Sequence, residues 1–164
     1  YMLVGVVSDT HNLVANIEKI IDIFNMQKVG LVIHTGDITK ASTLKRFSRL
    51  DSKLIGVYGN NDLEEKGLKE TSFNNKFEFQ EPPLIRDIGG KKILILHEPD
   101  EIKEFIESDP SIDVVLHGHT HRYVNKKIKG VKIINPGECA GMLKGKNAIG
   151  ILNLNDLSFK RIFF

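Results

Sequence analysis

The sequence predicts a mixed α/β fold in which two packed, mixed β-sheets are flanked by helices. In the first half of the chain, apolar runs alternate with segments of helical periodicity, which is typical of βαβ units with parallel strands. From residue 113 onward, short apolar runs follow one another with turns between them, which indicates mostly strands. We expect one domain over residues 1–164, an ordinary length for a domain with a substantial core.

Three strands with two helices between them account for the first half. Continuous apolar runs, typical of strands covered on both faces, predict strands at residues 2–7, 31–34 and 54–58. Asn12 is interpreted as the cap of a helix whose apolar face carries Leu13, Ile17, Ile20, Ile21 and Phe24. A second helix is predicted over 41–50. Asp62 and Glu65 have the spacing of a capping box for a further short helix.

Strands dominate the second half. Gly89-Gly90 separates two apolar runs, 84–88 and 92–96, and predicts a hairpin. A helix is expected over 101–108, before Pro110. Further strands are predicted at residues 114–117, 123–128, 131–134, 148–154 and 159–163, with a turn at Lys129-Gly130. The aromatic-rich ending, 159–164, is interpreted as a core strand rather than a dimer contact.

Charge and cysteine content narrow the function classes. The chain has 21 acidic and 23 basic residues, and this balance demands neither nucleic acid nor a membrane as partner. Cys139 is the single cysteine, so no internal disulfide forms and a reducing compartment is expected. No secretory leader or membrane-spanning run is evident. We therefore expect a cytoplasmic protein.

Potential metal ligands follow five of the predicted strands. The motifs are Ser8-Asp9-Thr10-His11, Thr35-Gly36-Asp37, Gly59-Asn60-Asn61-Asp62, His97-Glu98 and Gly118-His119-Thr120-His121. Ligand sites in α/β sheets lie at the carboxyl ends of strands, so these side chains are expected to converge. They are nitrogen and oxygen donors without a thiolate, and they exceed the three protein ligands of a catalytic zinc. The sequence therefore predicts a two-metal hydrolase.

Spacing strengthens two of these motifs. Asp9 and His11 lie two residues apart, as do His119 and His121, and an extended backbone would point both members of a pair to the same side. Gly118 allows close backbone approach beside the second pair. The other motifs, taken singly, have ordinary explanations as turn or buried residues. This applies to Asp37, Asn60 and His97.

Taken together, the motifs resemble the calcineurin-like metallophosphoesterase superfamily, and in particular its small single-domain bacterial and archaeal phosphodiesterases. The family order D-x-H, G-D, G-N-x-D/E, H and G-H-x-H is matched from Asp9 to His121, and Asn135-Pro136-Gly137 resembles the N-P-G turn that follows. The resemblance implies the metallo-dependent phosphatase-like fold, a four-layer αββα arrangement.

The resemblance also implies a ligand set. Asp9, His11, Asp37 and His121 would surround one metal, and Asp37, Asn60, His97 and His119 the other. Asp37, Asn60 and His97 would serve catalysis directly, with a metal-bridging hydroxide attacking the phosphate ester in line. Two divalent ions are expected, Mn²⁺ foremost, with Ni²⁺, Zn²⁺ or Fe²⁺ as alternatives.

Three positions depart from the family pattern. Asn61 stands where many members carry a histidine that protonates the leaving group, and an amide cannot replace that acid. We therefore expect a preference for leaving groups that depart unprotonated, such as nitrophenolate. Glu98 follows His97 where glycine is usual, and it is interpreted as a cap for the helix at 101–108 rather than a group that repels anionic substrates. Glu138 replaces a small hydroxyl residue and brings a carboxylate to the substrate pocket.

Further polar residues have two interpretations each. His34 and His117 either orient a metal ligand or are buried histidines with a hydrogen-bond partner, and the second is favoured. Four lysines near the 129–130 turn are expected to protect an exposed sheet edge rather than bind nucleic acid. They are Lys126, Lys127, Lys129 and Lys132.

The leading prediction is a cytoplasmic phosphodiesterase with a small phosphate ester as substrate. The alternatives are a phosphomonoesterase, a nucleotide pyrophosphatase and, from another class, a protein-binding scaffold like the retromer subunit of this fold. A nuclease is less favoured because the charge is balanced. A homodimer or larger homo-oligomer is left open.

Overall fold

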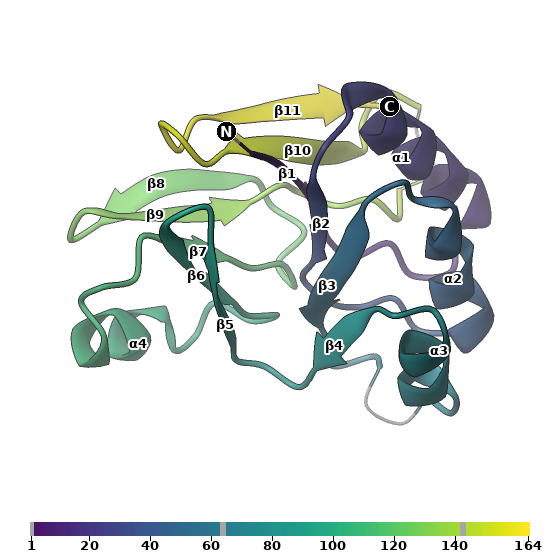
Figure 1. Ribbon diagram of the computed structural model, residues 1–164, viewed down its shortest axis with the longest axis horizontal. Helices are drawn as coiled ribbons and strands as arrows, with labels where there is room; N and C mark the ends of the chain where they lie inside the picture. The colour runs from purple at the N-terminus through teal and green to yellow at the C-terminus, as the bar shows by residue number, and fades with distance from the viewer. Residues whose placement is uncertain (1, 63–64, 142–143) are drawn as a thin grey trace.

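The computed structural model describes residues 2–62, 65–141 and 144–164, which form two β-sheets with helices on their outer faces (Figure 1). In spatial order, the first sheet contains β11 (Phe159–Phe163), β10 (Ala148–Asn153), β1 (Leu3–Val7), β2 (Leu31–His34), β3 (Lys53–Val57) and β4 (Glu78–Gln80). The second sheet contains β5 (Leu84–Ile88), β6 (Lys91–Ile95), β7 (Val114–Leu116), β9 (Val131–Asn135) and β8 (Val124–Ile128). The helices are α1 (Val14–Gln27), α2 (Ala41–Arg46) with a 3₁₀ turn at Phe47–Arg49, α3 (Leu68–Asn74) and α4 (Ile102–Ser108).

Alternating side chains build the layers. Along β1, Val4 and Val6 point into the apolar core between the sheets, whereas Val7 packs in the core beneath the helices. α1 places Ile17, Ile20, Ile21 and Phe24 in that outer core because they recur at helical spacing. A third apolar cluster joins α4 to the second sheet. The order helices, sheet, sheet, helix confirms the predicted αββα fold class.

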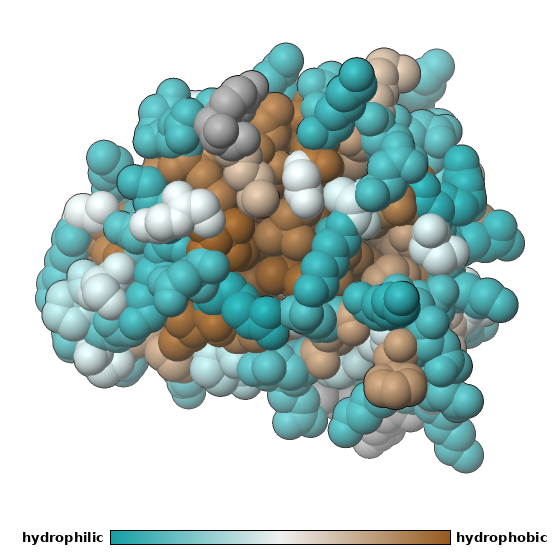
Figure 2. All heavy atoms as spheres, in the orientation of Figure 1, coloured by the Kyte–Doolittle hydropathy of each residue, from teal (hydrophilic) through white to brown (hydrophobic). Residues whose placement is uncertain are grey.

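Figure 2 shows the seam between the sheets from one side. Apolar side chains gather at the centre of this face, over the region where Figure 1 shows the sheets meeting, and hydrophilic side chains surround them. The inter-sheet core is thus flanked by polar rims. None of the helices described is long and apolar enough to cross a membrane.

Strand direction determines where the loops meet. β1, β2 and β3 are parallel neighbours in the first sheet, and β6, β7 and β9 are parallel neighbours in the second. Parallel strands carry their carboxyl ends at one edge, so the loops that follow them lie together. All five predicted donor motifs belong to such loops.

The edge strands agree in part with two sequence interpretations. β8 is an edge strand of the second sheet, and its Lys126 and Lys127 are exposed, as expected of lysines that protect an edge. Lys132 instead lies on the inner strand β9, and Lys129 pairs with Glu107. β11 pairs antiparallel with β10, so the aromatic ending is a strand as predicted, but it is a partly exposed edge strand and not a core strand.

Three local predictions were wrong. α1 begins after Leu13 without a side-chain cap. The side-chain oxygen of Asn12 instead accepts hydrogen bonds from Thr39, Lys40 and Thr43, around the start of α2. The short helix predicted after Asp62 would begin at residues 63–64, which lie outside the described residues; the described segment 65–67 is not helical, α3 starts at Leu68, and the Asp62 carboxylate accepts hydrogen bonds from backbone amides. Glu98 does not cap α4, whose N-terminus has no side-chain cap.

Candidate metal centre

The loops after β1, β2, β3, β6 and β7 bring all seven predicted donors to one place. His121 and the backbone amide of His119 contact Asp9. His11 and His97 contact Asp37, and His97 also contacts Asn60. The backbone that achieves this is not extended. Positive φ angles of 46° to 68° occur at Asp9, His11, Asp37, His119 and His121.

The predicted extended geometry of the two pairs was therefore wrong, although both pairs do point their side chains into one site. Left-handed backbone is costly for residues other than glycine, by about 1–3 kcal/mol each, and it is concentrated at functional sites. Its repetition at five donor positions shows that the loops are held in conformations that they would not adopt alone.

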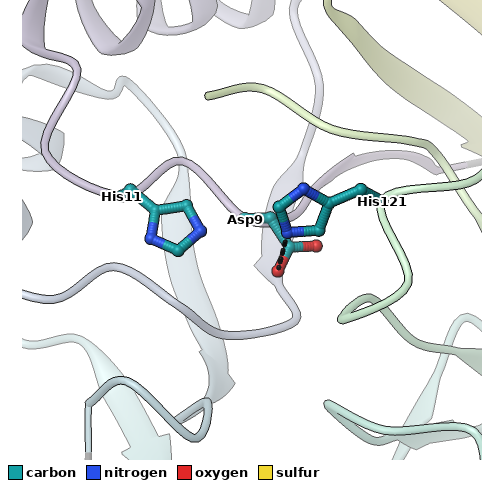
Figure 3. A group of neighbouring side chains, drawn as sticks. All are labelled: Asp9, His11 and His121. Atoms are coloured by element: carbon teal, nitrogen blue, oxygen red, sulfur yellow. Dashed lines mark ion pairs between the residues drawn. The ribbon is translucent and has the colours of Figure 1, made fainter. Parts of the chain in front are cut away.

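Asp9, His11 and His121 form the first donor group (Figure 3). One ligand atom from each lies within 4.8 Å of the others, which leaves room for one ion among them. In Figure 3 the His121 ring faces the Asp9 carboxylate, with 3.6 Å between Nε2 and Oδ1, and the His11 ring lies to one side of this pair.

The Asp9 carboxylate is only half satisfied. Its Oδ2 accepts hydrogen bonds from the Ser8 hydroxyl at 2.5 Å and from the His119 amide at 3.1 Å. Its Oδ1 is buried and has no hydrogen-bond partner in the part of the chain that is described. Burial raises the pKa of Asp9, and the Ser8 hydrogen bond only partly opposes this. A buried acceptor without a donor is costly, and a cation beside Oδ1 would satisfy it.

Asn60, His97 and His119 form the second donor group. The carbonyl oxygen of Asn60 lies 2.8 Å from His97 Nε2 and 3.2 Å from His119 Nδ1, and these two nitrogens lie 3.3 Å apart. His97 is buried, whereas Asn60 and His119 are exposed, so this group faces solvent on one side.

The protonation of His97 follows from its other contact. Its Nδ1 lies 2.9 Å from the backbone carbonyl of Thr35, which can only accept, so Nδ1 carries the proton. Nε2 faces two acceptors, the Asn60 oxygen at 2.8 Å and Asp37 Oδ2 at 3.5 Å, and although burial opposes it, the Asp37 carboxylate raises the pKa of His97 and so favours a proton on Nε2. Two acceptors this close require a proton or a cation between them. This is the orientation that metal-binding histidines adopt when a carbonyl fixes the tautomer.

Asp37 lies between the two groups. Its Oδ2 is 3.8 Å from His11 Nε2 and 3.5 Å from His97 Nε2. Both oxygens also accept hydrogen bonds from Asn61, at 3.0 Å from the amide and 2.9 Å from the side chain. Burial alone would raise the pKa of Asp37, but the contacts with His97 and Asn61 outweigh it and hold that pKa well below its usual value. Asp37 is therefore a stable anion between the two donor groups.

Asp62 organises the loops, a role that sequence reasoning missed. Its buried carboxylate accepts hydrogen bonds from four backbone amides at 2.6 to 3.0 Å: those of Asp37, Ile38, Thr39 and Gly59. These amides belong to the loops after β2 and β3. One carboxylate thus fixes the positions of both Asp37 and the Asn60 loop.

Glycine is required where loops cross. A Cβ at Gly59 would lie 2.2 Å from Asp37 Oδ1, and one at Gly118 would lie 1.9 Å from the Ser8 hydroxyl. Gly118 therefore permits the close approach that the sequence predicted, and Gly59 has the same function on the other side of the centre.

Glu138 orients His121. Its Oε2 lies 2.8 Å from His121 Nδ1, so that nitrogen donates and Nε2 is directed toward Asp9. Sequence reasoning assigned Glu138 to the substrate pocket, and no local signal linked it to a histidine 17 positions away.

The remaining histidines do not touch a donor side chain. His34 is buried, accepts from the Gly36 amide and bonds to the Thr10 hydroxyl, and burial lowers its pKa to about 3. His117 contacts the Gly118 carbonyl. Both match the favoured interpretation of buried histidines with partners.

Comparison with known proteins identifies the family. The model of the calcineurin-like phosphoesterase superfamily domain matches residues 2–157. The chain belongs to this superfamily. It is 37% identical over 163 residues to a phosphodiesterase of Methanocaldococcus jannaschii, covering 98% of each chain. This confirms the predicted enzyme class, a metal-dependent phosphoester hydrolase.

Solved structures agree with the fold. A structure of a novel archaeal phosphodiesterase has a TM-score of 0.89 and 37% identity, covering 99% of this chain and 100% of that one. Zinc-bound Vps29 of Entamoeba histolytica has a TM-score of 0.70, with 99% of each chain covered, but its 20% identity shows the fold alone.

The donors fit the divalent metals that membership implies. The first group offers an unsatisfied buried carboxylate oxygen, and His97 and His121 each direct Nε2 toward the centre because an acceptor holds their other nitrogen. Nitrogen and oxygen donors of this mixture suit first-row divalent ions.

Proposed function

We propose that the protein is a phosphodiesterase that uses two divalent metal ions, Mn²⁺ foremost, with Ni²⁺, Zn²⁺ or Fe²⁺ as alternatives. The observation that carries the proposal is the position of Asp37 between the two donor groups, with its Oδ2 3.8 Å from His11 Nε2 and 3.5 Å from His97 Nε2. Asp9, His11, Asp37 and His121 would hold one ion, and Asp37, Asn60, His97 and His119 the other. When bound, two such ions supply Lewis-acid stabilisation of the phosphoryl oxygens and lower the pKa of a water molecule.

The residues around the donors hold the donor side chains in position for metal binding. Asp62 fixes the loops of Asp37 and Asn60 through backbone amides, and Glu138 and the Thr35 carbonyl set the tautomers of His121 and His97. Such preorganisation removes a reorganisation cost from the reaction. Asp37, Asn60 and His97 would take the most direct part in catalysis because they lie nearest the junction of the two groups.

Preference for diesters is supported by the full-length likeness to a protein named as a phosphodiesterase. Asn61 further limits which leaving groups can depart. Its side-chain amide donates to Asp37 at 2.9 Å, so it lies at the centre but cannot protonate a leaving oxygen. Esters with good leaving groups are therefore the favoured substrates.

Hydrolysis of bis-p-nitrophenyl phosphate and p-nitrophenyl phosphate tests the proposal. Metal-stripped protein is assayed after addition of Mn²⁺, Ni²⁺, Zn²⁺ or Fe²⁺, with Asp37→Asn as the variant. We expect metal-dependent turnover, faster with the diester, that falls at least about a hundredfold in the variant. Equal turnover by the variant, or faster hydrolysis of the monoester, would contradict the proposal.

A further inference from the structure

A pocket of about 290 Å³ opens beside the second donor group. Asn60 and His97 form part of its wall, so the pocket adjoins the junction of the donors. The remaining lining comes from the end of β3, the segment between β4 and β5, and the segment from β6 into α4. A substituent on a phosphate held at the donors would reach into it.

Most of the wall is apolar. The apolar side chains are those of Tyr58, Pro82, Pro83, Leu96 and Phe105. Tyr58 is 5% exposed and stacks on Phe79 at 5.6 Å, so this part of the wall is held in place. Pockets for small molecules usually span about 300–1,000 Å³, so this one suits a compact group.

The polar part of the lining is acidic. Glu98, Asp100 and Glu101 line the pocket, and no lysine or arginine is among its lining residues. Within the described residues, none of these three carboxylates forms an ion pair or accepts a hydrogen bond. Their negative charge is therefore not paired with a basic side chain, which favours a cation and disfavours an anion in the pocket.

We propose that this pocket binds the non-leaving organic substituent of the phosphodiester and selects a compact, cationic substituent over an anionic one. This inference rests on the proposed function, because the phosphate must lie at the donors for its substituent to enter the pocket. A substrate with an additional phosphate in this position is disfavoured, which separates the protein from nucleotide pyrophosphatases.

Three diesters with a common p-nitrophenolate leaving group test the pocket. Their second substituents are cationic in p-nitrophenyl phosphorylcholine, neutral in ethyl p-nitrophenyl phosphate, and anionic in 2-carboxyethyl p-nitrophenyl phosphate. The variant combines Glu98→Gln, Asp100→Asn and Glu101→Gln. The control combines Asp51→Asn, Glu104→Gln and Glu107→Gln, which removes the same charge from exposed positions outside the pocket lining. All six positions are exposed, so both proteins are expected to fold.

We expect kcat/KM of the wild type to be highest for the cationic ester and about tenfold or more lower for the anionic one, as a few unpaired charges at contact distance would produce. The pocket variant should reduce this ratio to near one, while the control should leave it unchanged. An unaltered ratio in the pocket variant, or a wild-type preference for the anionic ester, would overturn the inference.

Binding separates this inference from the proposed function. If the wild type hydrolyses none of the esters, the proposed function fails, and calorimetry with metal-loaded protein still tests the pocket. The probes are phosphorylcholine and 2-carboxyethyl phosphate. Tighter binding of phosphorylcholine by the wild type, lost in the pocket variant and kept in the control, supports the inference. Equal binding of the two probes by the wild type would refute it.

Discussion

Replacing Asp62 by alanine tests whether one buried carboxylate supports both halves of the metal centre. The carboxylate is 3% exposed and accepts hydrogen bonds from four backbone amides, at 2.9 Å from Asp37, 3.0 Å from Ile38, 2.6 Å from Thr39 and 2.8 Å from Gly59. A hydrogen bond to a charged group contributes about 1.5–3 kcal/mol, and a buried donor left unsatisfied costs about 1–3 kcal/mol.

The four contributions are not additive, because water can enter the space left by the side chain and hydrate some of the amides. We therefore expect Asp62→Ala to lower the free energy of unfolding by about 3–5 kcal/mol, a large part of the roughly 5–15 kcal/mol of a typical domain. Asp62→Asn keeps the shape but loses one acceptor oxygen, so its loss should be about half as large.

Urea unfolding of the metal-free proteins measures these losses. Asp51→Ala is the matched control, since Asp51 is exposed and its carboxylate accepts no hydrogen bond from the described residues. It should change stability by less than about 0.5 kcal/mol. If Asp62→Ala lowered the free energy of unfolding by less than about 1 kcal/mol, the reasoning would be refuted, because the loss of a charged acceptor from four buried amides must cost more than this.

Three further predictions follow from single contacts. Glu138→Gln, which weakens the acceptor at His121 Nδ1, should lower metal affinity about tenfold or more by calorimetry, and unchanged affinity would show that Glu138 does not orient the ligand. Asn61→His should speed esters with poor leaving groups relative to nitrophenyl esters, by up to about a hundredfold, and equal changes for both would exclude a missing acid. Burial lowers the pKa of His34 from 6.5 to about 3, so the folded state resists protonation of this ring. The free energy of unfolding is therefore highest above pH 6.5 and falls by about 1.4 kcal/mol per pH unit as the pH decreases toward 3. Urea unfolding of metal-free wild type and His34→Gln between pH 5 and 7 should show a flatter pH dependence in the variant, and identical slopes would contradict this.

The strands and the donors were predictable because their signals are local. Apolar runs identify β1, β2 and β3 directly, and each run ends at a donor motif, so parallel strand direction brings the donors of this sheet together. The packing of the second sheet against the first adds the donors that follow β6 and β7. β4 was missed because Glu78–Gln80 is a three-residue strand without an apolar run. The 41–50 helix was predicted as one element, but it ends in a 3₁₀ turn at Phe47–Arg49.

The supporting contacts were not predictable because they join distant positions. Asp62 accepts hydrogen bonds from backbone amides 23 to 25 residues earlier in the sequence. Glu138 contacts His121, which lies 17 residues earlier, before β8 and β9. Asn12 was interpreted as a helix cap because a sequence shows only the residue type of a cap. Its side-chain oxygen in fact accepts hydrogen bonds from the hydroxyl groups of Thr39 and Thr43. The left-handed backbone of the donors was not predicted either, because it is uncommon for residues other than glycine and the enrichment of aspartate and histidine in it does not identify single positions.

The proposed two-metal centre requires that Asp37 join both metal sites. Anomalous diffraction from crystals grown with Mn²⁺ tests it directly. We predict two peaks about 3.5–4 Å apart, one on each side of the Asp37 carboxylate. A single peak, or two peaks that do not share Asp37, would contradict the claim even if the protein hydrolysed phosphodiesters.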